Sequence, residues 1–203
     1  MRAINTLLIV IGVIGIIVLM AVFTGFILFS LDPPIKTQLS TVPVSADALK
    51  SFDQKVASFK QKIEASNAAK EKKEVVLTIT SEEINSKIVE LVAQGELPLK
   101  ETVINFDNDL CKVYTVFNNP GVSAKIGLVA QFMVNKGSVK IVTVDFQVGR
   151  LPLQQSFIKS VGSILDVMIR MEGSTDELQI DITGVTVADG RLTIRGMTRG
   201  IPK

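Results

Sequence analysis

An uninterrupted apolar run near the amino terminus, Thr6–Phe29, constrains this 203-residue chain more than any other feature. It reads TLLIVIGVIGIIVLMAVFTGFILF and contains no charged residue. As a helix, these 24 residues would extend about 36 Å at about 1.5 Å per residue, and the hydrocarbon core of a bilayer is about 30 Å thick. The run therefore predicts a transmembrane helix.

The residues around this run predict an uncleaved signal anchor over residues 1–30. A cleavable signal peptide has a shorter apolar stretch and a small-x-small cleavage site, whereas FSLDPPIK follows here and offers neither such a site nor a cysteine for lipid attachment. Arg2 and the amino terminus carry positive charge before the run, against Lys36 and Lys50 after it. A short basic tail is most simply kept in the cytoplasm. We therefore expect a single-pass cell-membrane protein with an extracytoplasmic C-terminal domain; the reverse orientation is the alternative.

Composition argues against several classes of function. The chain has no histidine, the commonest general base and a common metal ligand. Its formal net charge of +2 is far from the concentrated basic face that nucleic-acid binding needs. The single cysteine, Cys111, lies in the alternating segment DLCKVY, which predicts a buried thiol rather than a nucleophile. No glycine-rich phosphate loop or G-x-S-x-G motif occurs outside the anchor. We predict no enzymatic activity, no cofactor, no metal and no nucleic-acid partner.

A linker and a helix are expected after the anchor. Residues 31–44 predict an extended linker, because Pro33 and Pro34 end the membrane helix. Residues 45–73 predict an amphipathic stalk helix with Ser45 as its N-cap. Its apolar side chains recur at steps of three and four residues, at Leu49, Phe52, Val56, Phe59 and Ile63. Two heptads are short for a coiled coil, so we expect packing against the following domain, with self-association as the alternative.

Residues 74–203 predict an α+β domain with a curved, mostly antiparallel sheet packed against two helices. VVLTIT predicts a strand, and the TSEE that follows places Thr80 and Glu83 at capping-box spacing for a helix. Polar turns then separate four strands, expected at 102–107, 110–117, 122–134 and 138–148. ELQIDI, GVTVADG and RLTIRGM predict the last strands.

One face of this sheet is expected to be apolar and to need a cover. On the third strand, alternation places on one face Ile126, Leu128, Ala130, Phe132 and Val134. On the fourth strand, the same reasoning groups Val142, Val144, Phe146 and Val148. A helix at 152–171, with apolar residues at helical spacing, is the expected cover. A lipid-like ligand would lie between the two, and the candidate lining is Phe132, Val144, Phe146, Phe157, Val161 and Leu165. The same side chains would also suit an ordinary filled core.

Two acidic pairs have a structural interpretation. Glu82 and Glu83 are adjacent in the first turn of a helix, where capping and the helix dipole explain them. Asp107 and Asp109 flank a turn that lacks the glycine and distal glutamate of a calcium loop, which favours a plain hairpin turn.

The order of the motifs along the chain carries a family resemblance. An anchor is followed by a strand leading into TSEEINSKI, then by several strands, by GRLPLQQSFIKSVGSILDVMI and by ITGVTVADGRLTIRG. In this order they resemble YpmS-like proteins of bacterial membranes, and the last two segments are similar to the mycobacterial LmeA-like lipid-binding proteins. The resemblance covers roughly Val75 to Gly196. It implies an extracytoplasmic domain with a curved sheet around an elongated apolar cavity, comparable to tubular lipid-binding folds, and it carries over no catalytic residue.

Together these features predict a membrane-tethered extracytoplasmic protein that binds or transfers a lipid-like apolar ligand. The expected partners are the membrane, through Thr6–Phe29, and a lipid; an envelope protein is a further candidate. The alternative is a non-catalytic structural or interaction module of the cell envelope that uses an exposed sheet edge.

Overall fold

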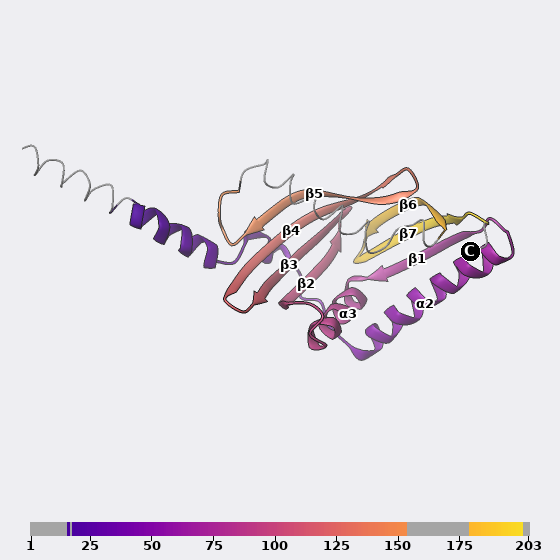
Figure 1. Ribbon diagram of the computed structural model, residues 1–203, viewed down its shortest axis with the longest axis horizontal. Coiled ribbons are helices and arrows are strands. Elements are labelled where there is room, and N and C mark those ends of the chain that lie inside the picture. Colours follow the sequence, from indigo (N-terminus) through magenta and orange to yellow (C-terminus); the bar gives the residue numbers. More distant parts are fainter. Residues whose placement is uncertain (1–15, 17, 154–178, 201–203) are drawn as a thin grey trace, which may run out of the picture.

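The computed structural model describes residues 16, 18–153 and 179–200, and it has the predicted α+β architecture (Figure 1). Within these residues, one helical stretch is long and apolar enough to cross a membrane, Val18–Gln38, with a mean hydropathy of 1.8. Its α-helical part, which we call the N-terminal helix, ends at Ser30. Most of the predicted span before Val18 lies outside the described residues. The N-terminal helix lies at one end of an elongated molecule, and α2 lies at the other end (Figure 1).

A three-stranded antiparallel sheet in the order β1-β7-β6 forms the part of the molecule farthest from the N-terminal helix (Figure 1). Its strands are β1 (Glu74–Thr80), β6 (Ile180–Ala188) and β7 (Arg191–Thr198). The predicted ELQIDI and GVTVADG strands are joined in β6, which carries an irregularity between Ile182 and Gly184.

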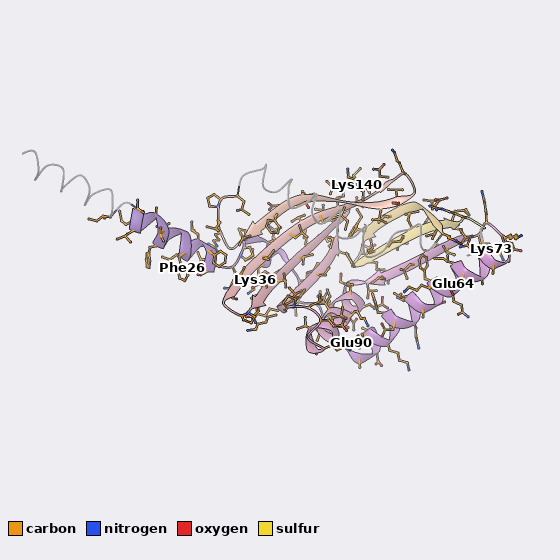
Figure 2. All side chains as sticks on the ribbon, in the orientation of Figure 1. Phe26, Lys36, Glu64, Lys73, Glu90 and Lys140 are labelled. Carbon is orange, nitrogen blue, oxygen red and sulfur yellow. The ribbon has the colours of Figure 1, made fainter. Side chains whose placement is uncertain are left out.

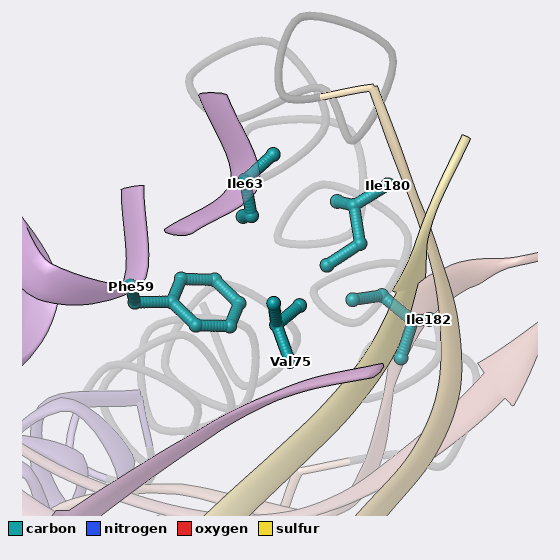
Figure 3. Close-up of a cluster of buried hydrophobic side chains, with 5 residues drawn as sticks. All are labelled: Phe59, Ile63, Val75, Ile180 and Ile182. Atoms are coloured by element: carbon teal, nitrogen blue, oxygen red, sulfur yellow. The ribbon is translucent and has the colours of Figure 1, made fainter. Parts of the chain in front are cut away.

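The helix α2 (Ala46–Ala68) covers this sheet and begins at the predicted N-cap, where the Ser45 side chain accepts a hydrogen bond from the Ala48 N–H. Figure 3 shows side chains of α2 meeting those of the sheet in a cluster made of Phe59, Ile63, Val75, Ile180 and Ile182. Ile63 is 1% exposed and Ile180 is 0% exposed. Packing against the domain is thus confirmed for α2. The helix shares a core with the sheet instead of standing apart as a stalk.

The short helix α3 (Ser81–Ala93) follows β1 directly, as the capping sequence predicts. The Thr80 side chain accepts a hydrogen bond from the Glu83 N–H at 3.1 Å, and the Glu83 carboxylate accepts one from the Thr80 N–H at 2.9 Å. This reciprocal pair confirms the capping box, so the tight change from strand to helix is encoded locally.

A second antiparallel sheet has the order β2-β3-β4-β5 and lies between the N-terminal helix and the three-stranded sheet (Figure 1). The strands are β2 (Leu99–Asp107), β3 (Leu110–Asn119), β4 (Val122–Asn135) and β5 (Ser138–Val148). Each predicted strand is confirmed, because the polar turns between them form hairpins. The turn after β2 has left-handed residues at Asn108 and Asp109, as a plain hairpin turn requires.

The two sheets meet in a second apolar cluster, at the ends of strands that lie far from the N-terminal helix. Buried Phe106, Cys111 and Val187 form its centre, and Ile84 and Phe132 pack against it. Backbone hydrogen bonds strengthen the contact, since residue 182 donates to residue 137 and residue 109 donates to residue 187. The single sheet expected from the sequence is therefore divided in two, and the apolar face of the four-stranded sheet is closed at this end.

A β-bulge in β5 changes which side chains share a face. Ala130 pairs with Thr143, whereas Val129 pairs with Asp145, so Val144 is an extra residue without a partner on β4. A bulge reverses the alternation on one side of it. The prediction that Val142 shares a face with Phe146 is therefore wrong.

Candidate functional site

The C-terminal end of the N-terminal helix is bound to the segment that follows β5. The Arg150 N–H donates a hydrogen bond to the carbonyl oxygen of Leu28 at 2.7 Å, and Arg150 Nε donates to the carbonyl oxygen of Asp32 at 3.2 Å. Gly149 has a φ of 55°, and a Cβ on it would collide with the carbonyl oxygens of Leu28 and Phe29. The close approach of the two backbones therefore requires glycine at this position.

The connector between the helix and α2 is packed on the four-stranded sheet. The sequence predicts an extended linker over residues 31–44, but its middle forms a 3-10 helix, η1 (Pro34–Gln38). Ile35 in this helix is 1% exposed and lies over Gly127 of β4, where a Cβ would collide with the Ile35 side chain. The Ile35 N–H donates to Oε1 of Gln147 at 3.1 Å. The first part of the connector is therefore packed on the sheet, whereas residues 39–44 have no regular secondary structure.

Asp32 lies at the centre of four polar residues that join the connector to the sheet, and we call them the junction cluster: Asp32, Lys36, Tyr114 and Lys125. Asp32 Oδ1 lies 2.9 Å from Lys125 Nζ, and Asp32 Oδ2 lies 3.1 Å from Lys36 Nζ. The Tyr114 hydroxyl donates to Asp32 Oδ1 at 3.2 Å and accepts a hydrogen bond from Lys36 at 3.1 Å. In Figure 2, Lys36 is labelled where the N-terminal helix meets this sheet.

Tyr114 gives the junction cluster its fixed geometry. Its side chain is 2% exposed, and burial raises the pKa of its hydroxyl. The phenol therefore remains a hydrogen-bond donor near neutral pH, and its ring lies 4.5 Å from the Lys36 ammonium, within the range of a cation–π contact. The charged members are partly exposed, so each ion pair contributes at most about 1 kcal/mol. The cluster serves to orient the sheet on the helix more than to stabilise it.

The junction cluster was not predicted from the sequence. The available signal was an acidic residue directly after an apolar run, followed by two prolines and a lysine four residues later. The partners on β3 and β4 could not be identified from the sequence, because they depend on which face of each strand meets the connector.

On the opposite face of the same sheet, five half-buried apolar side chains lie together near the end of the N-terminal helix. Val113, Leu128 and Phe146 form one row across β3, β4 and β5, in which Val113 also packs against the cluster between the sheets. Ile126 and Val148, beside Thr115 of β3, form the next row. Val148 precedes the glycine that contacts the helix, so the second row is adjacent to the junction. We call these five residues the helix-proximal apolar face.

A buried hydroxyl group lies farther along this same side of the sheet. Thr143 pairs with Ala130, and its Oγ1 is buried without a hydrogen-bond partner among the residues that the structure describes. A buried hydroxyl normally has a partner, because leaving it unpaired costs about 1–3 kcal/mol. Near the helix, the one hydroxyl of this kind among the described residues is that of Thr115, which pairs with Ile126 and bonds the Thr102 hydroxyl, whereas the Thr143 hydroxyl deeper in is unpaired.

The structure places the candidate lining residues in different environments. Phe146 belongs to the helix-proximal apolar face, and Phe132 packs in the closed cluster between the sheets. Val144 is the bulge residue and is 50% exposed. The other three, Phe157, Val161 and Leu165, lie outside the described residues, as does the helix expected at 152–171 except for its first two residues, which are not helical.

Two ionisable groups outside these regions have structural roles. Burial raises the pKa of the Cys111 thiol to about 12, which keeps it protonated and unreactive near neutral pH. Burial opposes ionisation of Glu83, but bonds from Lys55, Ser51 and the Thr80 N–H outweigh it and lower the pKa of that carboxyl. Among residues 16, 18–153 and 179–200, no group of three or more acidic, cysteine or histidine side chains is placed to hold a metal ion.

Comparison with known proteins found no family model that matches this chain, and no curated protein matches it significantly.

Proposed function

We propose that this protein is a single-pass, membrane-tethered protein of the cell envelope whose extracytoplasmic domain binds or hands over a lipid-like ligand. The ligand lies on the helix-proximal apolar face. The observation that carries this proposal is the position of that face, because its Ile126–Val148 row adjoins the segment bound to the end of the apolar helix. With the helix in a bilayer, an acyl chain leaving the membrane surface would reach these side chains first.

The rigid junction supports the same proposal. A flexible tether would let the domain turn in any direction, whereas η1 and the junction cluster hold the sheet in one orientation relative to the helix. Burial of an acyl chain contributes about 0.8 kcal/mol for each CH₂ group removed from water. The resemblance to YpmS-like and LmeA-like proteins, which stays a prediction, implies the same kind of ligand.

The direct test is native mass spectrometry of the full chain, extracted from a bacterial membrane in a mild detergent that can be removed in the gas phase. We expect one bound lipid per chain. This lipid should remain bound under activation conditions that remove the lipids surrounding the membrane helix. A chain that is consistently empty under these conditions would contradict the proposal.

Two neighbouring substitutions provide a matched comparison. Leu128→Gln places an amide on the helix-proximal apolar face, and Val129→Gln places the same amide on the opposite face, where Val129 pairs with Lys112. Both residues are half-buried on one strand. We expect Leu128→Gln to lose most of the bound lipid and Val129→Gln to retain it; equal occupancy in the two variants would argue against this face.

The orientation in the membrane is tested with a membrane-impermeant maleimide on intact cells. Ala68, which is exposed at the end of α2, is a suitable position for an introduced cysteine. The native Cys111 does not interfere, because it is 7% exposed. We expect Ala68→Cys to be labelled before lysis. Labelling only after lysis would place the domain in the cytoplasm.

A further inference from the structure

The outer edge of β1 is open over two residues. Along the β1–β7 ladder, the Ser81 N–H donates to the carbonyl of Gly190, and the Lys73 carbonyl accepts from the Thr198 N–H. Backbone groups alternate in direction along a strand, so those of Val76 and Thr78 point away from β7. No described residue forms a hydrogen bond with the backbone of either residue.

Two other strand edges, those of β2 and β6, are occupied by polar partners among the described residues. On β2, the side chain of Asn85 in α3 bonds both backbone groups of Ile104, and the Ser81 hydroxyl accepts from the Phe106 N–H. The outer edge of β6 bonds to the turn before β5 through the Ile182 N–H. By contrast, β1 has no proline, no charged residue between its first and last positions and no register shift. It lacks the features with which proteins usually protect a free edge.

A groove of about 470 Å³ runs along this open edge. One wall is the β1 segment from Val76 to Thr78, and the other wall is a single stripe of α2. That stripe has residues at helical spacing, Ser51, Lys55, Ser58 and Lys62, with Phe59 also lining the groove. A volume of this size is typical of ligand sites, and its walls offer backbone groups on one side and polar side chains on the other.

The charge of the groove is positive. Lys55 Nζ lies 2.7 Å from Glu83 and is neutralised by it, whereas Lys62 is exposed and has no ion-pair partner among the described residues. Lys62 faces the same groove as the free backbone groups of Val76 and Thr78.

We propose that β1 binds an extended segment of a partner protein by strand addition, and that this segment carries an acidic side chain opposite Lys62. The backbone of the segment pairs with Val76 and Thr78, as in other complexes where a peptide extends a sheet. Its acidic side chain supplies the charge that the exposed lysine lacks. This surface lies on a different sheet from the helix-proximal apolar face, so the proposal does not depend on lipid binding.

The test is selection from a phage-displayed library of random seven-residue peptides on the full chain in nanodiscs. We expect enrichment of β-branched sequences with an acidic residue, and the tightest such peptide, made synthetically, is then titrated against variants. Val76→Pro removes the outward N–H at an edge position that tolerates proline, and Val76→Ala keeps it. We expect about tenfold weaker binding to Val76→Pro and little change in Val76→Ala.

A charge variant and a folding control complete the design. Lys62→Glu should reverse the preference for acidic over basic peptides without changing the melting temperature. If Val76→Pro lowers that temperature, the same comparison is made with Thr78→Pro and Thr78→Ala. The proposal is overturned if no peptide is enriched, or if the proline and alanine variants bind equally. It is also overturned if the wild-type chain is a dimer that Val76→Pro converts to a monomer, because a second copy would then occupy the edge.

Discussion

The two sheets of this protein use their apolar faces differently. The three-stranded sheet is closed by α2, which brings Ile63 and Ile180 to 1% and 0% exposure. The four-stranded sheet is closed at its far end, around Phe106 and Cys111, but its side chains near the N-terminal helix are only half-buried. The first arrangement is typical of a core that stabilises the fold. In the second, the described residues leave apolar side chains only half-buried beside the segment that we propose to lie in the membrane, and this difference locates the proposed site.

The largest expected effect is a difference between the two sheets in how much stability is lost when an apolar side chain is truncated to alanine. Ile180→Ala empties a fully buried position and should cost about 2–5 kcal/mol of unfolding free energy, whereas Ile126→Ala on the helix-proximal apolar face should cost about 1 kcal/mol. Pulse proteolysis in increasing urea measures both. Equal losses would mean that the two sheets have equivalent cores, and the contrast between them would fail.

Asn85 tests how the four-stranded sheet is held by α3. Its amide side chain bonds the N–H and C=O of Ile104 at 2.9 and 2.7 Å. Asn85→Ala leaves both backbone groups unpaired and should cost about 2–3 kcal/mol.

Asn105 is the matched control for that change. It lies one residue beyond Ile104, and its Oδ1 has no partner among the described residues. Asn105→Ala should cost under about 1 kcal/mol in the same urea experiment. A similar loss in both variants would show that the amide of Asn85 has no special role at the strand edge.

Gly149 tests the rigid junction that distinguishes the four-stranded sheet from the other sheet. Gly149→Ala adds a methyl group that collides with the end of the N-terminal helix. Gly121→Ala adds one at φ 86° with nothing within 4 Å. In both variants an alanine must adopt a left-handed backbone conformation, which costs about 1 kcal/mol. The difference between the two variants therefore reports only the collision with the N-terminal helix. We expect faster hydrogen exchange over residues 28–36 in Gly149→Ala alone; exchange that is unchanged there would refute the tight junction.

The smallest expected effect is a change in how stability depends on pH, and it arises on the α2–α3 side of the molecule. The pKa of Glu83 is lowered from its ordinary value of 4.5 in the folded state, because bonds from Lys55, Ser51 and Thr80 outweigh its burial. A lowered folded-state pKa contributes stability that is complete above the ordinary value and is lost as pH falls through the folded value. We expect Glu83→Gln to cost about 1–2 kcal/mol at pH 7 and to remove part of the stability loss below pH 4.5. If the free energy of unfolding changed with pH in the same way in the wild-type chain and in Glu83→Gln, this role of the Glu83 carboxylate would be contradicted.

Much of the fold follows from local sequence signals. The turn residues between strands and the capping pair Thr80 and Glu83 specify elements through contacts a few residues apart, and these predictions are confirmed. The apolar stripe of α2 likewise predicts the side that carries Phe59 and Ile63 into the core. Such patterns depend on the period of one element and need no knowledge of its neighbours.

What the sequence did not predict depends on contacts between distant segments. The bulge at Val144 leaves no mark in an alternating run such as VTVDFQV, yet it exchanges the faces of the residues before it. The packing of Ile35 on the sheet depends on the absence of a side chain at Gly127, 92 residues later. Division of the strands into two sheets is also decided by tertiary pairing, since β1 bonds to β7 and not to β2. Of the candidate lining residues that the structure describes, only Phe146 lies on the helix-proximal apolar face, because Phe132 packs in the cluster between the sheets and Val144 is the bulge residue.

The central claim, that lipid contacts the helix-proximal apolar face, is tested most directly by photo-crosslinking. The full chain is reconstituted into vesicles whose phospholipid carries a diazirine at the end of one acyl chain, then irradiated and mapped by tandem mass spectrometry. We predict adducts on Ile126, Leu128 and Phe146, in addition to the anchor, and none on Lys112 or Gln131 of the opposite face. Adducts confined to residues 6–29 would contradict the account.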